Sequence, residues 1–185
     1  MYVLTFFALQ ISLFINSKKL GQGTTSQYDN PTPKRIIKLD GCDIAQASGG
    51  VDFTVLLDSS GTRLLVCGDG KDSLLGTTDA NCDDYQEMSP VPCLLEGVSK
   101  SNPPVKSVDC GETHTIVICE NGSAYSWGHG ESGALGHGRS GLGNDISVVG
   151  FDVPRPKKIT TKKRVNFLMA ACGTHHSLLL FTNDE

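Results

Sequence analysis

The chain is poor in the residues and motifs that usually mark an enzyme, a metal site or a nucleic-acid-binding protein. Tryptophan occurs once and methionine three times among 185 residues. No two cysteines have the CxxC spacing of a zinc site, and no Gly-x-Ser-x-Gly nucleophile motif is present. A net charge of -4 provides no global basic field for nucleic acid or an anionic membrane. We therefore expect no intrinsic catalysis, no cofactor, no metal site, and no nucleic acid or chromatin as the partner.

A disulfide framework is not expected either. The number of cysteines is odd, at seven, which leaves at least one of them without a partner. The usual fate of such cysteines is burial as small apolar side chains in a reducing compartment, so we expect a cytoplasmic or nuclear protein. The seven residues are Cys42, Cys67, Cys82, Cys93, Cys110, Cys119 and Cys172.

Glycine, in contrast, is abundant, and three of the 21 glycines are evenly spaced. Gly50, Gly111 and Gly173 lie 61 and 62 residues apart, and the residues around them agree. The similar stretches are ASGGVDFTVLLDSSGTRLLVCG at 47–68, VDCGETHTIVICENGSAYSWG at 108–128 and AACGTHHSLLLFTNDE at 170–185. Tandem copies, each too small to bury its own apolar face, indicate a solenoid or a propeller of stacked units. The three glycines should meet a backbone need, either a positive φ or a close approach.

Each copy contains two β-prone runs separated by a turn. In the middle copy, the apolar run 116–119 is followed by Glu-Asn-Gly-Ser and then by the run 124–127. Asn121-Gly122 between two such runs is a strong hairpin signal. The first run is apolar at successive positions, which predicts a strand that is covered on both faces. A blade of a β-propeller meets this requirement because it lies between two neighbouring blades.

These motifs resemble the regulator-of-chromosome-condensation type of repeat. The resemblance rests on CGETHT at 110–115, on YSWG at 125–128 followed by GALG at 133–136, and on a Pro-x-Pro that recurs at 31–33, 90–92 and 154–156. It implies an all-β fold: a partial β-propeller of stacked antiparallel blades, with about three repeats of a seven-bladed type. The predicted units are the tail of a first repeat at 20–41, a second repeat at 42–104, a third at 105–166 and the start of a fourth at 167–185.

The first 19 residues, MYVLTFFALQISLFINSKK, form an apolar segment outside the repeat pattern. Its apolar part, 3–15, is shorter than a membrane-spanning helix requires. Two interpretations stay open. One is a secretory signal peptide over 1–17, which would make the protein secreted, although no basic region precedes the apolar part. The other is a replaced or misread start of a longer repeat chain. A membrane is expected to matter only if this segment is real.

Two motifs that could suggest chemistry have structural explanations. The residues 128–133 satisfy GxGxxG, and 136–141 do so again, but the glycine-rich sequence that follows cannot sustain the helix that a dinucleotide site needs. His114 aligns with His176 and with Phe53. A position that accepts imidazole or phenyl is typical of a buried aromatic slot between blades, and not of a general base or metal ligand. We predict no catalytic, cofactor-binding or metal-binding residue.

Two charged clusters and two loops are candidates for contacts with other molecules. PRPKKITTKKR at 154–164 is basic, and it is either a nuclear-import or phosphate-contacting patch or a solvated link between blades. DANCDDYQE at 79–87 is acidic but lacks the spacing of a calcium loop. Variable loops on one rim of a propeller often bind partners, so Thr77–Pro92 and His137–Pro156 are the contact candidates.

The favoured function is protein–protein interaction within a larger scaffold or regulatory protein. The resemblance implies two alternatives. One is a guanine-nucleotide exchange factor for a Ran-like small GTPase, although no exchange-active loop residue can be matched here. The other is a repeat module of a ubiquitin ligase or a kinase. Light sensing, which a plant branch performs with tryptophans just after the motif glycine, is not indicated because those places hold Val51, Glu112 and Thr174.

Blade count has a further consequence for solubility. About three blades cannot close a ring, so the first and last blades should expose apolar faces such as 178–181, LLLF. An exposed apolar strand at an edge is a template for association. We therefore expect the 185-residue chain to be poorly soluble or to self-associate.

Overall fold

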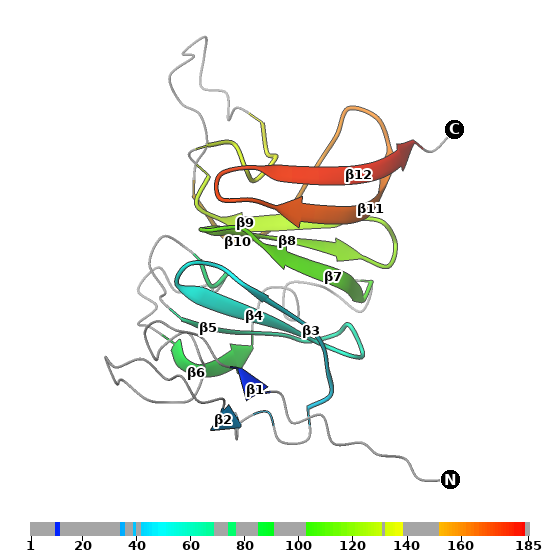
Figure 1. Cartoon of the computed structure of the whole chain (residues 1–185). Coiled ribbons are helices and arrows are strands. Elements are labelled where there is room, and N and C mark those ends of the chain that lie inside the picture. The colour runs from blue at the N-terminus through cyan, green and yellow to red at the C-terminus, as the bar shows by residue number, and fades with distance from the viewer. Residues whose placement is uncertain are drawn as a thin grey trace, which may run out of the picture.

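The computed structural model describes residues 42–68, 74–76, 85–90, 103–130, 132–138 and 152–183, together with Gln10–Ile11, Lys34–Arg35 and Leu39. The elements in these ranges are β-strands (Figure 1), which confirms the predicted all-β fold. Of the apolar segment 1–19, only Gln10–Ile11 is described, and this short strand β1 pairs with β2 (Lys34–Arg35). In the described part of the chain, no helix has the length and apolar character that crossing a bilayer requires.

Two four-stranded antiparallel sheets and one hairpin make up most of the structure. In both sheets the strands are neighbours in the order in which they follow along the chain. The first sheet contains β3 (Ile44–Gly49), β4 (Phe53–Asp58), β5 (Leu64–Gly68) and β6 (Tyr85–Pro90). The second contains β7 (Val105–Cys110), β8 (His114–Cys119), β9 (Ala124–Gly128) and β10 (Val153–Lys158). The hairpin contains β11 (Val165–Cys172) and β12 (Ser177–Asn183).

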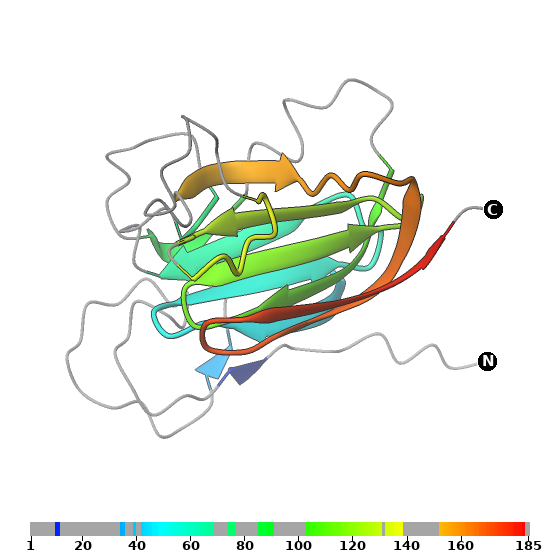
Figure 2. The same ribbon diagram turned by 90° about the horizontal axis from the view of Figure 1, so that it is seen from above.

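The three units are stacked face to face. The hairpin β11–β12 covers the second sheet, and the second sheet covers the first (Figure 1). Seen from above, the strands of successive units run in similar directions (Figure 2). The first strand of each unit lies against the first strand of the next, β3 against β7 and β7 against β11. This is the arrangement of the innermost strands of consecutive propeller blades, so the fold is a partial β-propeller.

Strand β8 shows why the repeat is apolar at successive positions. All six of its residues are buried. Val117 belongs to the core between the two sheets, together with Phe53 and Trp127, whereas Ile116 and Ile118 belong to a separate core that also contains Phe167 of β11. Successive side chains of a strand point to opposite faces, and both faces of this strand are covered. The predicted two-sided coverage is confirmed.

The turn after β8 forms the predicted hairpin. Gly122 has a φ of 73°, and its N–H donates to the Cys119 carbonyl at 2.9 Å. The Asn121 carboxamide oxygen accepts from the N–H and the hydroxyl of Ser123 at 3.0 and 2.7 Å. Asn and Gly thus supply the side-chain acceptor and the left-handed conformation that this turn needs.

The three evenly spaced glycines serve the second of the two predicted needs, a close approach. A Cβ on Gly50 would lie 2.1 Å from the ring of Phe53, and a Cβ on Gly111 would lie 2.2 Å from the ring of His114. Gly173 has the same relation to His176, also at 2.2 Å. Each glycine leaves room for the ring three residues later, which explains why the two positions recur together.

The two ends of the stack differ, and the prediction that both expose apolar faces was wrong for one of them. The outer face of the hairpin is exposed, with Leu178 at 67% and Leu180 at 55%. On the first sheet, Leu39 is buried in a cluster with Leu56 and Leu65. Leu39, from the residues 20–41 that the sequence predicts as the tail of a first repeat, packs on this face.

Candidate interaction surface

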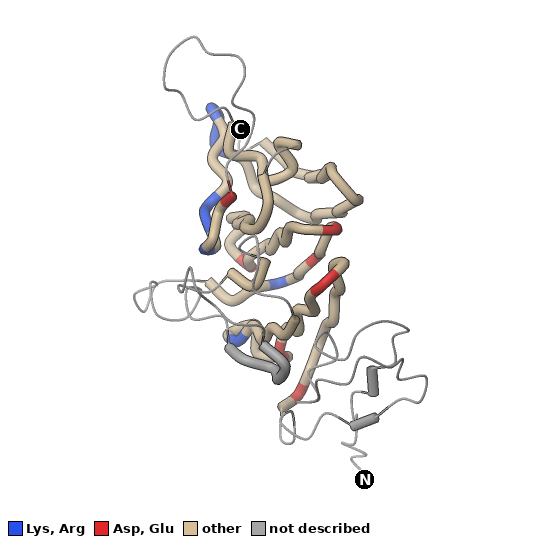
Figure 3. The backbone as a smooth tube through the Cα atoms, turned by 90° about the vertical axis from the view of Figure 1, so that its left-hand side faces the viewer, with Lys and Arg blue, Asp and Glu red and all other residues tan. Residues whose placement is uncertain are grey.

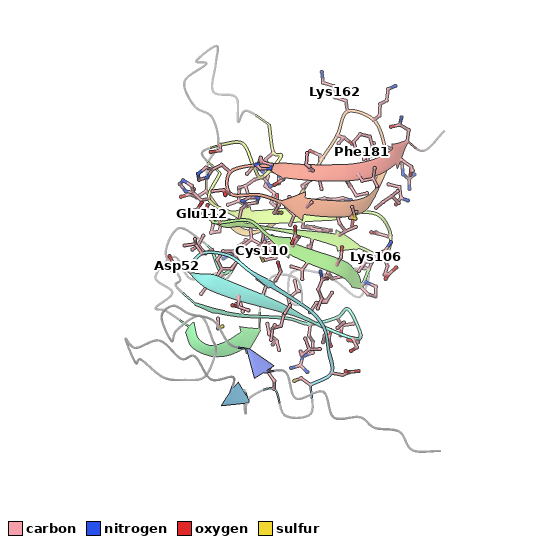
Figure 4. The ribbon with its side chains drawn as sticks, viewed as in Figure 1. Asp52, Lys106, Cys110, Glu112, Lys162 and Phe181 are labelled. Carbon is pink, nitrogen blue, oxygen red and sulfur yellow. The ribbon has the colours of Figure 1, made fainter. Side chains whose placement is uncertain are left out.

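The turns between the first and second strands of the three units lie at the same end of the stack. We call this end the turn face, and Asp52 and Glu112 mark it in Figure 4. Lys106 and Lys162 lie toward the opposite end. The turn face consists of the residues Val51, Asp52, Glu112, Thr113, Thr174 and His175, with His129 and Asp152 from the neighbouring loop.

Backbone hydrogen bonds join the first turn of the turn face to the second, and the second to the adjacent loop. The N–H of Val51 donates to the carbonyl of Glu112 in the next unit at 3.0 Å. The N–H of His129 donates to the carbonyl of Thr113 at 2.9 Å. The surface is therefore part of the rigid scaffold, whereas the side chain just after the motif glycine differs in each repeat: Val51, Glu112 or Thr174.

Carboxylates and imidazoles give the turn face its chemical character. His129 Nδ1 lies 2.8 Å from Asp152 Oδ1, and the same oxygen accepts from the N–H of Gly130 at 3.2 Å. His175 Nε2 lies 3.9 Å from Glu112 Oε2, with the side chains 68% and 34% exposed. An exposed pair such as His175 and Glu112 contributes little stability, so these two groups remain available to a partner.

Beneath the turn face, polar side chains of one inner strand hold the inner strand of the next unit. The side-chain amide of Gln46 donates to the carbonyl of Val108 at 2.8 Å and accepts from its N–H at 3.0 Å. These two bonds satisfy backbone groups that would otherwise be unpaired between blades. The partners are 62 residues apart, so the bonds join equivalent parts of successive repeats.

A second contact of this kind repeats between both pairs of units. Ser48 Oγ accepts the N–H of Cys110 at 3.0 Å, and Asp109 Oδ2 accepts the N–H of Cys172 at 2.7 Å. Ser48 and Asp109 both stand two residues before a motif glycine. The third copy has Ala171 at this place, which has no side-chain acceptor. Sequence reasoning missed these braces, and their only signal was a polar residue at that position in two copies.

His114 occupies the predicted buried slot, but it also makes a hydrogen bond. The side chain is 1% exposed, and its Nε2 lies 2.8 Å from Ser177 Oγ in the next unit. Ser177 Oγ donates to the carbonyl of Ala134 at 2.9 Å, so the hydroxyl proton is engaged and His114 Nε2 is the donor. Burial lowers the pKa of His114, which favours the neutral ring. The aligned His176 is exposed, contrary to prediction, because no described strand covers it.

The described cysteines are free thiols, and burial makes Cys67 and Cys110 poor nucleophiles. Cys67 and Cys110 are buried, which raises the pKa of Cys67 to about 12 and that of Cys110 to about 11. A thiol with a raised pKa holds little of the reactive thiolate at neutral pH. The expected role of these two residues as small apolar core side chains is confirmed, whereas Cys82 and Cys93 lie outside the described residues.

The third glycine of the GxGxxG motif lies in turns, and the only tryptophan is buried in the core. Residues 132–135, around the third glycine of the motif, form turns, and no helix begins there. Trp127 is fully buried, and its indole N–H donates to the carbonyl of Leu74 at 3.2 Å. Among the residues that the structure describes, no three His, Cys, Asp or Glu side chains are grouped as metal ligands.

The predicted contact loops are described only in part. Of Thr77–Pro92, the structure describes the backbone of β6 alone. Of His137–Pro156, it describes the two ends, and His137 Nε2 lies 3.0 Å from Ser126 Oγ. The remainder of both loops and most of the acidic cluster 79–87 lie outside the described residues.

Comparisons with known proteins agree with the repeat and the fold. The family model described as the regulator of chromosome condensation (RCC1) repeat matches residues 63–118 and 121–180. Each match begins before the third strand of one unit and ends in the second strand of the next, so it spans two sheets. The crystal structure of Prp20p from Saccharomyces cerevisiae is similar, with a TM-score of 0.73 and 22% identity over 92% of this chain and 39% of that chain.

Three curated relatives that this chain resembles are different kinds of protein. The chain is 31% identical to the serine/threonine-protein kinase Nek9 of Xenopus laevis over 88% of this chain and 15% of the relative. It is 31% identical to the probable E3 ubiquitin-protein ligase HERC6 of Homo sapiens over 82% of this chain and 13% of the relative. It is 30% identical to the guanine nucleotide exchange factor SRM1 of Saccharomyces cerevisiae over 79% of this chain and 30% of the relative. The chain thus spans less than a third of the length of each, and through its repeats it belongs to the RCC1 repeat family.

Proposed function

We propose that the chain is a protein–protein interaction module and that a partner protein contacts the turn face. The observation that carries this proposal is the combination of a fixed frame with variable side chains. The first turn is joined to the second through the bond from Val51 N–H to the Glu112 carbonyl, and the second is joined to the adjacent loop, yet the residue after the glycine differs in each copy. Binding residues are often found on loops that a rigid scaffold positions.

The buried thiols also favour a binding module. Burial raises the pKa of the Cys67, Cys110 and Cys119 thiols, so they are poor candidates for nucleophiles. Free thiols are typical of a reducing compartment, and a cytoplasmic or nuclear location is part of the proposal. A module of this kind fits a scaffold, and it also fits a kinase or a ubiquitin ligase, as the relatives Nek9 and HERC6 illustrate.

A site-specific crosslinking experiment tests the turn face. A photoreactive amino acid at Val51 or Thr174 should capture a partner protein from the source cells. The control position is Glu120, which is exposed in the turn at the other end of β8. The captured protein, once purified, should bind the unmodified chain and lose that binding when Glu112 is changed to Arg. Capture at Glu120 alone, or binding that Glu112→Arg leaves unchanged, would refute the proposed surface.

The alternative is a guanine-nucleotide exchange factor for a Ran-like small GTPase. It is favoured by the relative SRM1 and by the fold of Prp20p, which has been studied for its binding to Gsp1p and histones. We expect no acceleration of labelled nucleotide release from Gsp1p by this chain, because no exchange-active loop residue can be matched to it. Acceleration that Glu112→Ala abolishes would favour the exchange factor.

A further inference from the structure

One basic motif takes no part in the turn face. Residues 153–183 contain six lysines and arginines but no aspartate or glutamate, although acidic residues outnumber basic ones in the whole chain. We call these six residues the basic stripe: Arg155, Lys157, Lys158, Lys162, Lys163 and Arg164.

The basic stripe is a folded surface. It begins on β10, the outermost strand of the second sheet, and continues into the connection 159–164 that leads to β11. All six side chains are exposed, and separate blue stretches of the backbone lie along one edge of the molecule in Figure 3. Between its two halves, Ile159 is buried, and its N–H donates to the carbonyl of Ala124 at 2.8 Å. This anchor fixes the backbone, so the positions of the charges are set by the fold.

The positive charge of the stripe acts on neighbouring groups. Burial is the main cause of the lowered pKa of His137, and the charge of Lys157 lowers it further. Burial raises the pKa of the Cys119 thiol, and Lys158 opposes this shift. Within the part of the chain that the structure describes, no ion pair with a carboxylate is found for Lys157, Lys158, Lys162 or Lys163. Their charges are therefore not compensated locally.

Protection of a sheet edge explains only half of the stripe. Lysines on an outer strand prevent edge-to-edge association, and this accounts for Lys157 and Lys158. The residues 162–164 lie in a connection, beyond the end of β10 and past the buried Ile159, so they are not themselves part of a strand edge. In the preceding repeat, the corresponding connection reads CLLEGVSKSNPP at 93–104, with one lysine and one glutamate. The blade itself therefore does not require a basic connection.

We propose that the basic stripe binds an acidic segment of a partner protein. The prolines at 154 and 156 lack N–H groups, so a partner strand would find few donors on this edge, and the contact must be made by the charged side chains. Ten residues, even if fully extended, span only about 35 Å, which suits a short acidic segment. A long nucleic acid would extend past the stripe. Its phosphates would then approach Asp152 and the rest of the protein, whose net charge of -4 repels them. This surface is independent of the turn face.

The test measures the fluorescence anisotropy of a labelled octapeptide of alternating Asp and Glu with the full chain, at about 0.15 M salt, where distant charges are screened. The variant Lys162→Glu with Lys163→Glu removes part of the stripe. The matched control, Arg63→Glu with Lys106→Glu, changes the net charge equally at exposed residues elsewhere. We expect saturable binding that weakens at least tenfold in the stripe variant and less than twofold in the control.

Three results would overturn the proposal. The first is no saturable binding of the peptide, and the second is an equal loss of binding in both variants, which would reflect net charge alone. The third is full displacement of the peptide by a duplex DNA at the same concentration of negative charges, which would assign the stripe to nucleic acid. Far-ultraviolet circular dichroism of both variants verifies that the substitutions leave the β-fold intact.

Discussion

Strands β8 and β12 occupy the same place in consecutive repeats, where the aligned stretches 114–119 and 176–181 read HTIVIC and HSLLLF, yet only β8 is buried on both faces. Ile116 and Ile118 of β8 are fully buried, whereas the aligned Leu178 and Leu180 of β12 are 67% and 55% exposed. Both strands pair with the first strand of their unit in a similar antiparallel register. The difference shows that the neighbouring unit provides burial, as expected of a fold in which each repeat contacts only the next.

The largest expected effect comes from deleting the same apolar side chain in the two strands. Ile116→Ala should cost about 3 kcal/mol, because it leaves a cavity between the second sheet and β11. Leu178→Ala should cost less than about 0.5 kcal/mol, because most of that side chain already contacts water. Urea unfolding of both variants measures the two values. Equal costs would show that the outer face of β12 is covered in solution.

The motif glycines offer a second comparison with a smaller effect. In Gly111→Ala the new Cβ would lie 2.2 Å from the buried ring of His114 and 2.5 Å from the carbonyl oxygen of Gly173, so we expect a loss of about 1 to 3 kcal/mol. In Gly173→Ala the contact is with the exposed ring of His176, which can rotate away, so the loss should be about 0.5 kcal/mol or less. Thermal unfolding of both variants checks the difference, and a larger loss at Gly173 would contradict it.

A third difference between the two strands is that β12, unlike β8, should promote self-association. The exposed apolar side chains of β12 should draw chains together, so sedimentation velocity should show association that increases with concentration. Leu178→Lys combined with Leu180→Lys should reduce this association because charges replace the apolar contact. A monomer that is independent of concentration in the unmodified chain would show that the end of the stack is capped.

The smallest expected effect is on the pH dependence of stability. Burial lowers the pKa of His114 in the folded state, while the unfolded chain has the ordinary value of about 6.5. The unfolded state therefore binds more protons, and stability should fall as the pH drops below that value and through the lowered pKa. His114→Phe should flatten this dependence in part, because burial lowers the pKa of His137 in the same direction. A slope that His114→Phe leaves unchanged would contradict the assignment.

The sequence predicted the elements of the repeat because they are local. The apolar run 116–119 indicated a strand covered on both faces, Asn121-Gly122 indicated the hairpin, and the spacing of Gly50, Gly111 and Gly173 indicated stacked units. All of these are patterns within one repeat or between aligned repeats, and the structure contains them.

What the sequence did not show depends on contacts between units. The brace from Asp109 to the N–H of Cys172 joins residues 63 positions apart, and no local pattern requires it. The exposure of His176 follows from the absence of a covering strand in the described structure, although its motif matches that of His114. The packing of Leu39 against Leu56 and Leu65 joins the residues 20–41 to the first sheet, and no pattern within one repeat specifies this contact.

Native-state hydrogen exchange at single amides compares the two strands most directly. The amides of Ile116 and Ile118 should exchange only through global unfolding, because β8 lies between β7 and β9 and is covered on both faces. The amides of Leu178 and Leu180 should exchange at least about a hundredfold faster, through local opening of a hairpin that is covered on one side. Equal protection of both strands, measured at a concentration at which the chain is monomeric, would contradict the claim that burial in this fold comes from the neighbouring unit.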